Sequence, residues 1–165
     1  MSNGVLAAAY AFHLAATAAW FGGLIFLAVL FPGPAAHLPQ SERDSSTASA
    51  VRRFLPIAWL CLAVFVGTGL VQMAASPRYE GLLALRSAWA AALLAKHLVI
   101  GCMVVVLAFQ TWYIHPRLER LELGLERPNP ESVARLHRLD VRLLRLSVVL
   151  SAVVLVLTAV ARANA

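Results

Sequence analysis

Two histidines lie inside apolar stretches that are long enough to cross a membrane, His13 in AFHLAATAAWFGGLIFLAVLF and His97 in SAWAAALLAKHLVIGCMVVVLAFQTWYI. Neutral imidazole is a good ligand for copper and for haem iron, and its second nitrogen needs a hydrogen bond. At about 1.5 Å per helical residue, both rings are expected ~12–15 Å below the same membrane surface. We therefore predict that His13 and His97 face each other across one metal or haem site. The alternative is that each ring only satisfies a backbone carbonyl or a neighbouring helix.

Other side chains are expected near this pair. Trp20 lies on the same helical face as His13, two turns deeper, and Thr17 offers a hydroxyl that would hold the His13 ring. A copper ion would need a third ligand, for which Met73 and Gln72 are the candidates.

Lys96 adjoins His97 and is the only lysine of the chain. A lysine in mid-span costs about 2.5–3.5 kcal/mol on insertion scales, so its presence needs a reason. It either snorkels to the lipid headgroups or faces the bundle, where it would bind an anionic group or carry a proton.

The composition indicates an integral membrane protein. Hydrophobic residues make up 61% of the chain and charged residues 13%, against about 45–50% and about 25% in soluble domains. Four apolar runs, about 5–31, 54–75, 87–114 and 143–161, reach the roughly 20 residues that a membrane helix needs. The sequence therefore predicts an all-α integral membrane protein, a single four-transmembrane-helix bundle over residues 1–165.

Helical structure is expected to continue outside these runs. Ser41 opens a capping-box pattern, which predicts a helix over about 42–53 that leads into span 2. Asn129 followed by Pro130 predicts a helix start near residue 130. Pro116 is expected to kink or end span 3.

Basic residues are distributed unevenly between the connecting segments. Ten arginines lie between spans 1 and 2 or between spans 3 and 4, whereas three lie on the opposite side. Because cytoplasmic segments collect arginine and lysine, both termini are expected on the non-cytoplasmic side. The net charge of +6 then reflects topology and lipid headgroup contact, and no nucleic-acid partner is expected. His37, His115 and His137 are interpreted as interfacial residues on the cytoplasmic side.

The order of these elements resembles the copper resistance protein D (CopD) domain family over nearly the whole chain. The shared elements are a histidine and Trp-x-Gly-Gly in span 1, an arginine-rich start and Thr-Gly in span 2, and an intramembrane lysine in span 3. They correspond here to His13, Trp20, Gly22, Gly23, Arg53, Thr68, Gly69 and Lys96. The resemblance implies a multi-pass protein of the bacterial inner membrane that takes part in copper uptake or resistance. The chain has only three methionines and no methionine-rich segment, which departs from a copper conduit.

A more distant similarity is to the HemJ family of protoporphyrinogen oxidases. These are four-helix membrane proteins that handle porphyrin, with a histidine in span 1 and a lysine in span 3. The segment FPGPAAH after span 1 differs from that family.

Four functions are compatible with these patterns. The first is CopD-like handling of copper through the intramembrane histidine site, with a periplasmic copper protein as partner. The second is a membrane b-type cytochrome, in which His13 and His97 hold haem b and electrons pass to or from quinone. The third is a HemJ-like oxidase, and the fourth is a structural subunit of a larger membrane complex. Imidazole serves copper and haem alike, so the residues themselves assign neither the metal nor an enzymatic activity.

Overall fold

Long helices make up the structure, a computed structural model that describes residues 2–31, 36–75, 88–123, 125 and 130–163. In chain order the elements are α1 (Asn3–Ile25), the π-helical turn η1 (Phe26–Leu30), α3 (Gln40–Ala74), α4 (Ala88–Phe109), the π-helical turn η2 (Gln110–Ile114), α5 (His115–Glu122) and α6 (Pro130–Ala163). No strand occurs within these ranges, so the all-α prediction is confirmed.

Four helical stretches are long and apolar enough to cross a membrane, namely Asn3–Leu30, Glu42–Ala74, Ala90–Leu121 and Pro130–Ala163. Large apolar side chains on their outward faces are more than half exposed, among them Leu14, Val66, Val105 and Val156. Such a surface would be unfavourable in water, but hydrocarbon chains solvate it in a bilayer. The protein is therefore a multi-pass membrane protein.

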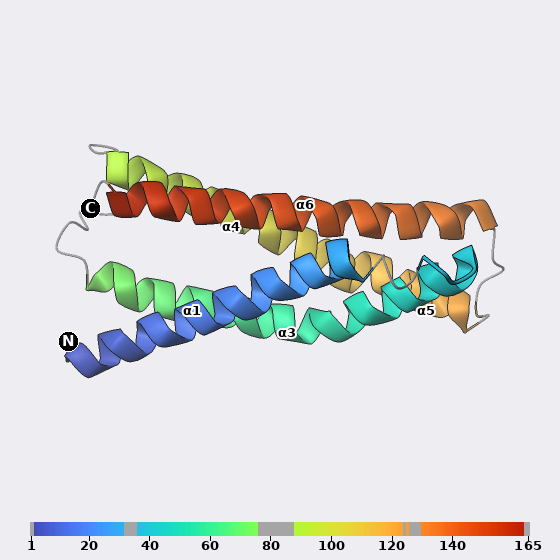
Figure 1. Ribbon diagram of the computed structural model, residues 1–165, viewed down its shortest axis with the longest axis horizontal. Helices are drawn as coiled ribbons and strands as arrows, with labels where there is room; N and C mark the ends of the chain where they lie inside the picture. Colours follow the sequence, from blue (N-terminus) through green and yellow to red (C-terminus); the bar gives the residue numbers. More distant parts are fainter. Residues whose placement is uncertain (1, 32–35, 76–87, 124, 126–129, 164–165) are drawn as a thin grey trace.

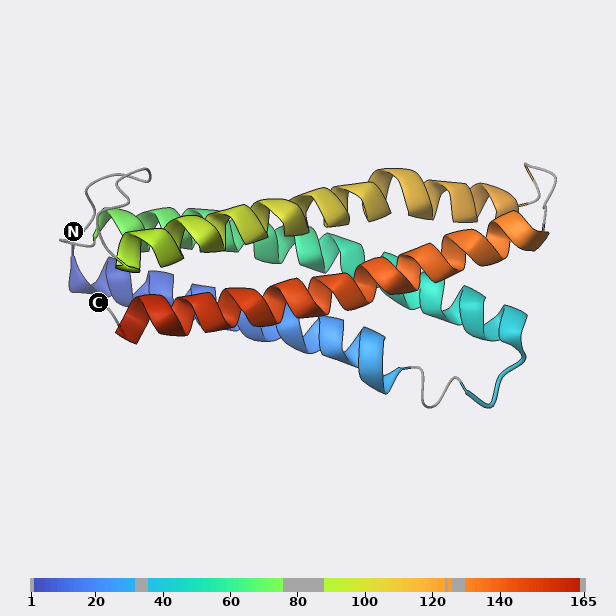
Figure 2. The same cartoon turned by 90° about the horizontal axis from the view of Figure 1, so that it is seen from above.

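The helices form two closely packed pairs. α1 packs along α3, and α4 packs along α6, so that one pair lies over the other (Figure 1 and Figure 2). Both termini lie at one end of the bundle (Figure 1), which we term the termini end. The opposite end, which includes α5, we term the arginine-rich end. Which of the two faces the cytoplasm stays a prediction.

The two pairs meet in a buried core in the middle of the bundle. All of the long helices contribute to it, with Trp20, Leu24, Leu55, Ala58, Met103, Leu107 and Leu144 among its members. The approach of α1 to α3 depends on Gly23, because the Phe54 ring lies where a β-carbon would be. A β-carbon on Gly22, in contrast, would meet open space.

Two helices extend beyond the apolar runs, as the sequence predicted. α3 begins at Gln40 with Pro39 at its N-cap, so the capping-box pattern at Ser41 placed the start slightly late. α6 begins at Pro130. Helices of 35 and 34 residues are about 50 Å long, against about 30 Å of hydrocarbon, so both project from the bilayer.

The helix irregularity that Pro116 predicts for span 3 is the π-helical turn η2. This wider turn ends directly before α5, in which Pro116 is near the first position. Proline has no amide hydrogen for the carbonyl four residues back, and the π-helical turn accommodates that missing bond.

Candidate functional site

The His13 ring is bound to α3 rather than to its own helix. Its Nδ1 lies 2.7 Å from the Thr68 hydroxyl oxygen. The Thr68 hydroxyl donates its single proton to the Val64 carbonyl, so its oxygen accepts from His13. Nδ1 therefore carries the hydrogen, and Nε2 of the neutral ring keeps a lone pair that is able to bind a metal.

Thr17 does not hold the ring, which corrects the expectation from the sequence. Its hydroxyl donates to the His13 backbone carbonyl at 2.8 Å, within α1. A threonine hydroxyl in a helix commonly bonds to the carbonyl four residues back, and that bond outcompetes a contact with the side chain one turn away. The residue that positions the ring is Thr68, which belongs to the Thr-Gly pair of span 2.

An aromatic column connects His13 with Trp20. The Phe65 ring of α3 contacts His13 edge-on at 5.3 Å and Trp20 edge-on at 6.1 Å between centroids. Trp20 is buried, and its indole N–H donates to the Ser151 hydroxyl of α6 at 3.0 Å. Trp20 thus lies below His13 as expected, but its polar atom is used in packing α1 against α6.

His97 has the same hydrogen-bonding pattern within its own helix. Its Nδ1 lies 2.6 Å from the Leu93 carbonyl, which accepts only, so Nδ1 carries the hydrogen and Nε2 keeps its lone pair. The ring is half-buried. Across the described residues, the structure gives no hydrogen bond or ring contact between His97 and His13, so a site shared by the two stays a prediction.

Lys96 lies on the core face of α4. It precedes Met103, Leu107, Gln110 and Ile114, all buried, at spacings that put them on one side of a helix. Its side chain is half-buried. This position is compatible with the bundle-facing interpretation, and the choice between that interpretation and snorkelling stays a prediction.

The two candidates for a third ligand lie near the end of α3. Gln72 is one helical turn after Thr68, and its amide nitrogen is buried with no hydrogen-bond partner in the described structure. Met73, the next residue, is half-buried. Both belong to the termini end, as do His13, Thr68 and Lys96.

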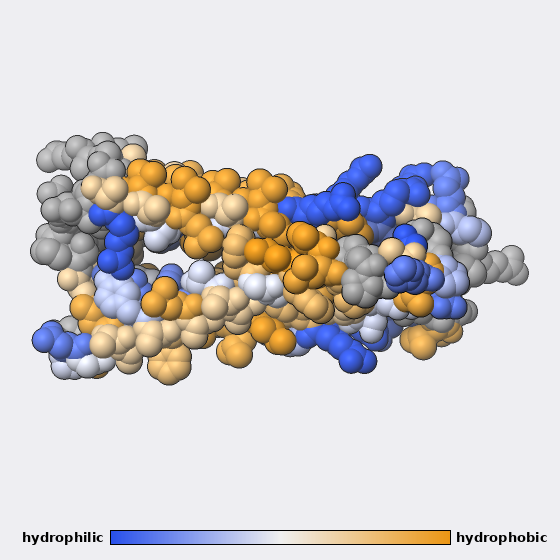
Figure 3. Space-filling view, in the orientation of Figure 1, coloured by the Kyte–Doolittle hydropathy of each residue, from blue (hydrophilic) through white to orange (hydrophobic). Residues whose placement is uncertain are grey.

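A hollow separates the two helix pairs at the termini end. The space-filling view shows it between the α1–α3 pair and the α4–α6 pair (Figure 3), whereas the middle of the bundle is closed. At this end the Arg162 guanidinium of α6 lies 5.3 Å from the Tyr10 ring centroid of α1.

A buried polar cluster at the opposite end was missed in the sequence. The Gln110 amide donates to Asp140 at 2.9 Å, and His115 Nε2 lies 3.5 Å from the same carboxylate oxygen. All three residues are at most 5% exposed, so His115 is buried inside the bundle, and its level relative to the membrane interface stays a prediction. Asp140 as the single acidic residue in the arginine-rich RLHRLDVRLLR stretch was the available signal. His37 is exposed and His137 is half-buried.

In the part of the chain that the structure describes, no three His, Cys, Asp or Glu side chains come together in a group that could hold a metal ion. A metal at the termini end would therefore draw on imidazole together with other donors, such as a thioether or an amide.

Comparison with known families agrees with this architecture. A family model described as "Copper resistance protein D" matches residues 48–161. The match includes Thr68, Lys96 and His97, and it begins after α1 and His13. Neither curated proteins nor solved structures gave a match. Because the matched segment extends over more than half of a chain with four membrane-length helices, the protein belongs to the copper resistance protein D family.

Proposed function

We propose that this membrane protein handles copper by binding the ion at Nε2 of His13, in the hollow at the termini end. The observation that carries the proposal is the Thr68 hydrogen bond to His13 Nδ1. A bond of this kind fixes the ring tautomer and orientation that a metal-binding histidine needs. Copper is the substrate here, taken up and released, and is not a permanent cofactor.

His97 and Met73 are proposed to complete the ligand set. His97 offers Nε2 because its Nδ1 hydrogen is used by the Leu93 carbonyl. Met73 offers a thioether, and copper(I) accepts both imidazole and thioether ligands. Gln72 is the alternative third ligand, since its side chain is partly buried at the same end.

Lys96 is proposed to limit how tightly copper is held. An ammonium group facing the hollow repels a metal cation at short range. A site meant for transfer must release its ion, and a neighbouring positive charge favours release. A periplasmic copper protein is the proposed exchange partner, given the expectation that the termini end is non-cytoplasmic.

The family match favours copper over haem b. A b-type cytochrome with His13 and His97 as axial ligands, a HemJ-like oxidase and a purely structural subunit receive no support from that match. An absorption spectrum of the purified protein distinguishes a b-type cytochrome or a HemJ-like oxidase from a copper-handling protein, because bound haem or porphyrin gives a Soret band. We expect no such band in protein purified from haem-replete cells.

The proposal is tested by titrating the purified protein with copper(I) against a chromophoric chelator. The single variants His13→Ala and His97→Ala are each expected to abolish most binding, and the double variant to be little worse than either. Such non-additivity is the property of a shared site. His137→Ala, at the arginine-rich end, is the matched control and should bind as the unmodified protein does. Full binding by His13→Ala would refute the proposal, and two independent partial losses would mean separate sites.

A further inference from the structure

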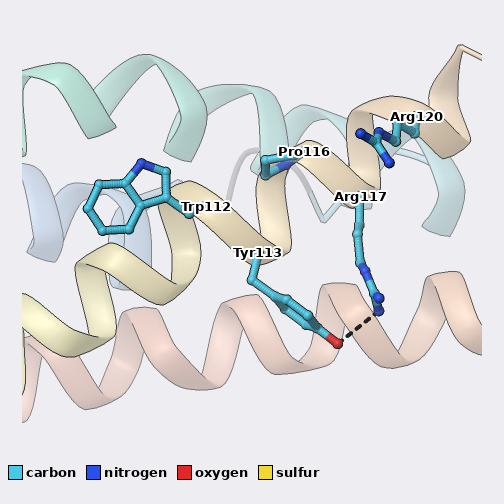
Figure 4. Close-up of a pocket in the computed structure, with 5 residues that line it drawn as sticks. All are labelled: Trp112, Tyr113, Pro116, Arg117 and Arg120. Atoms are coloured by element: carbon cyan, nitrogen blue, oxygen red, sulfur yellow. Dashed lines mark hydrogen bonds between the residues drawn. The ribbon is translucent and has the colours of Figure 1, made fainter.

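The outward face of η2 and α5 carries a pocket of about 180 Å³ that copper handling does not use. Its lining residues come from a single continuous stretch of chain and are Trp112, Tyr113, Pro116, Arg117 and Arg120 (Figure 4). The Trp112 side chain is 71% exposed, and both arginines are exposed. The pocket therefore opens toward the surroundings of the bundle and not toward its core.

Arg117 is held in place by Tyr113. Its guanidinium donates a 2.8 Å hydrogen bond to the Tyr113 hydroxyl (Figure 4), and its central carbon lies 4.3 Å from the centroid of that ring. A guanidinium fixed in this way loses less conformational entropy when it binds an anion. Arg120 lies about one helical turn further along the same pocket.

Positively charged side chains line part of the pocket. Two of its five lining residues are arginines, Arg117 and Arg120, and none is a carboxylate. Glu119, which lies between the arginines in the sequence, forms a 3.3 Å ion pair with Arg52 of α3. Guanidinium groups bind phosphate oxygens with charge-assisted hydrogen bonds, so the pocket suits a phosphate group.

The pocket also lies at the boundary between apolar and charged surface. Toward the termini end, the exposed side chains of α4 include Leu98, Val105 and Phe109. This apolar strip is about 16 Å long, comparable to an extended acyl chain. Trp112 and Tyr113 are of the types that prefer the level of the lipid headgroups.

We propose that this pocket binds the phosphate of an anionic phospholipid, whose acyl chains lie along the apolar strip from Leu98 to Phe109. Arg117 binds the phosphate oxygens, Arg120, whose side chain points away from that of Arg117 (Figure 4), adds positive charge near the headgroup, and Trp112 packs against the glycerol region. A headgroup without its own cation, such as phosphatidylglycerol, is preferred over phosphatidylcholine, because two guanidinium groups repel a trimethylammonium group.

Native mass spectrometry of the purified protein with equal amounts of phosphatidylglycerol and phosphatidylcholine tests this site. The double variant Arg117→Gln, Arg120→Gln is expected to lose the preference for phosphatidylglycerol, by roughly fivefold for each arginine. The double variant Arg135→Gln, Arg138→Gln in α6 has the same spacing and charge change and should keep it. Trp112→Ala, which changes no charge, should weaken retention of the lipid.

Two results would overturn the proposal. Equal losses in the two arginine double variants would show a general effect of net charge. Displacement of the bound lipid by excess inorganic phosphate would show a site for free phosphate, because a lipid is also held through its acyl chains. As a control for folding, each variant should elute from a size-exclusion column at the same volume as the unmodified protein.

Discussion

The Nδ1 nitrogen of His13 lies 2.7 Å from the hydroxyl oxygen of Thr68, and this bond joins α1 to α3. The two residues are far apart in the sequence, and only the packing of the two helices brings them together. Because the Thr68 hydroxyl donates its proton to the Val64 carbonyl, His13 Nδ1 must be the donor in the bond to Thr68. Nε2 of the neutral ring then keeps a lone pair that is able to bind a metal.

Replacement of Thr68 by valine keeps the shape of the side chain and removes the acceptor. The His13 ring would then be free to rotate and to change tautomer, and copper(I) affinity is expected to fall roughly tenfold to a hundredfold. Competition with a chromophoric chelator measures this. Thr17→Val is the control, because the Thr17 hydroxyl bonds only to the His13 backbone carbonyl. Equal losses in both variants would contradict a specific role for Thr68.

Replacement of Lys96 by methionine removes the positive charge that we propose lies near the copper site. Copper(I) is expected to bind more tightly, by roughly tenfold, while copper tolerance of cells that express the protein is impaired because release slows. Insertion should be retained or improved, since a central lysine costs about 2.5–3.5 kcal/mol. A silent Lys96→Met variant, unchanged in both affinity and tolerance, would support the snorkelling interpretation instead.

The bond from Trp20 to Ser151 is expected to stabilise the bundle. Ser151→Ala leaves the buried indole N–H without an acceptor and should lower the free energy of unfolding by about 1 kcal/mol. Unfolding in mixed detergent micelles, followed by tryptophan fluorescence, measures the change. Thr158→Val in the same helix removes a hydroxyl that bonds only to its own helix, and its stability should be nearly unchanged. A similar loss in both variants would argue against a bond between α1 and α6.

The orientation of the bundle is tested with a reporter that is active only in the periplasm. Fused after Arg127, in the segment between α5 and α6, it is expected to be inactive because the arginine-rich end should face the cytoplasm. Fused after Ala165, it should be active. The reverse pattern would place the His13 level in the cytoplasmic half of the membrane and remove the argument for a periplasmic copper partner.

The membrane helices could be predicted from the sequence because their signal is local. Runs of apolar residues such as 143–161 exceed the length of a bilayer crossing, and Pro130 marks the start of α6 whatever the helix packs against. The depths of His13 and Lys96 follow from helix rise alone.

The partners of the candidate site could not be predicted, because they depend on how the helices rotate against one another. Thr17 and Thr68 are both compatible with the depth of His13, and only the packing of α1 on α3 selects Thr68. The burial of His115 depends in the same way on Asp140, which a different helix contributes. A helix in lipid has apolar residues on all faces, so hydrophobic periodicity does not reveal which face is inside.

Nitrogen-15 NMR of histidine-labelled protein tests whether Nε2 of His13 binds copper while Thr68 accepts the hydrogen bond from Nδ1. His13→Ala assigns the His13 signals by their disappearance, and copper(I) is diamagnetic, so the bound ring stays observable. We expect a protonated Nδ1 and an unprotonated Nε2 before copper(I) is added, and a shift of the Nε2 signal on addition. A protonated Nε2, or a copper(I) titration that shifts only the signals of other histidines, would contradict this expectation.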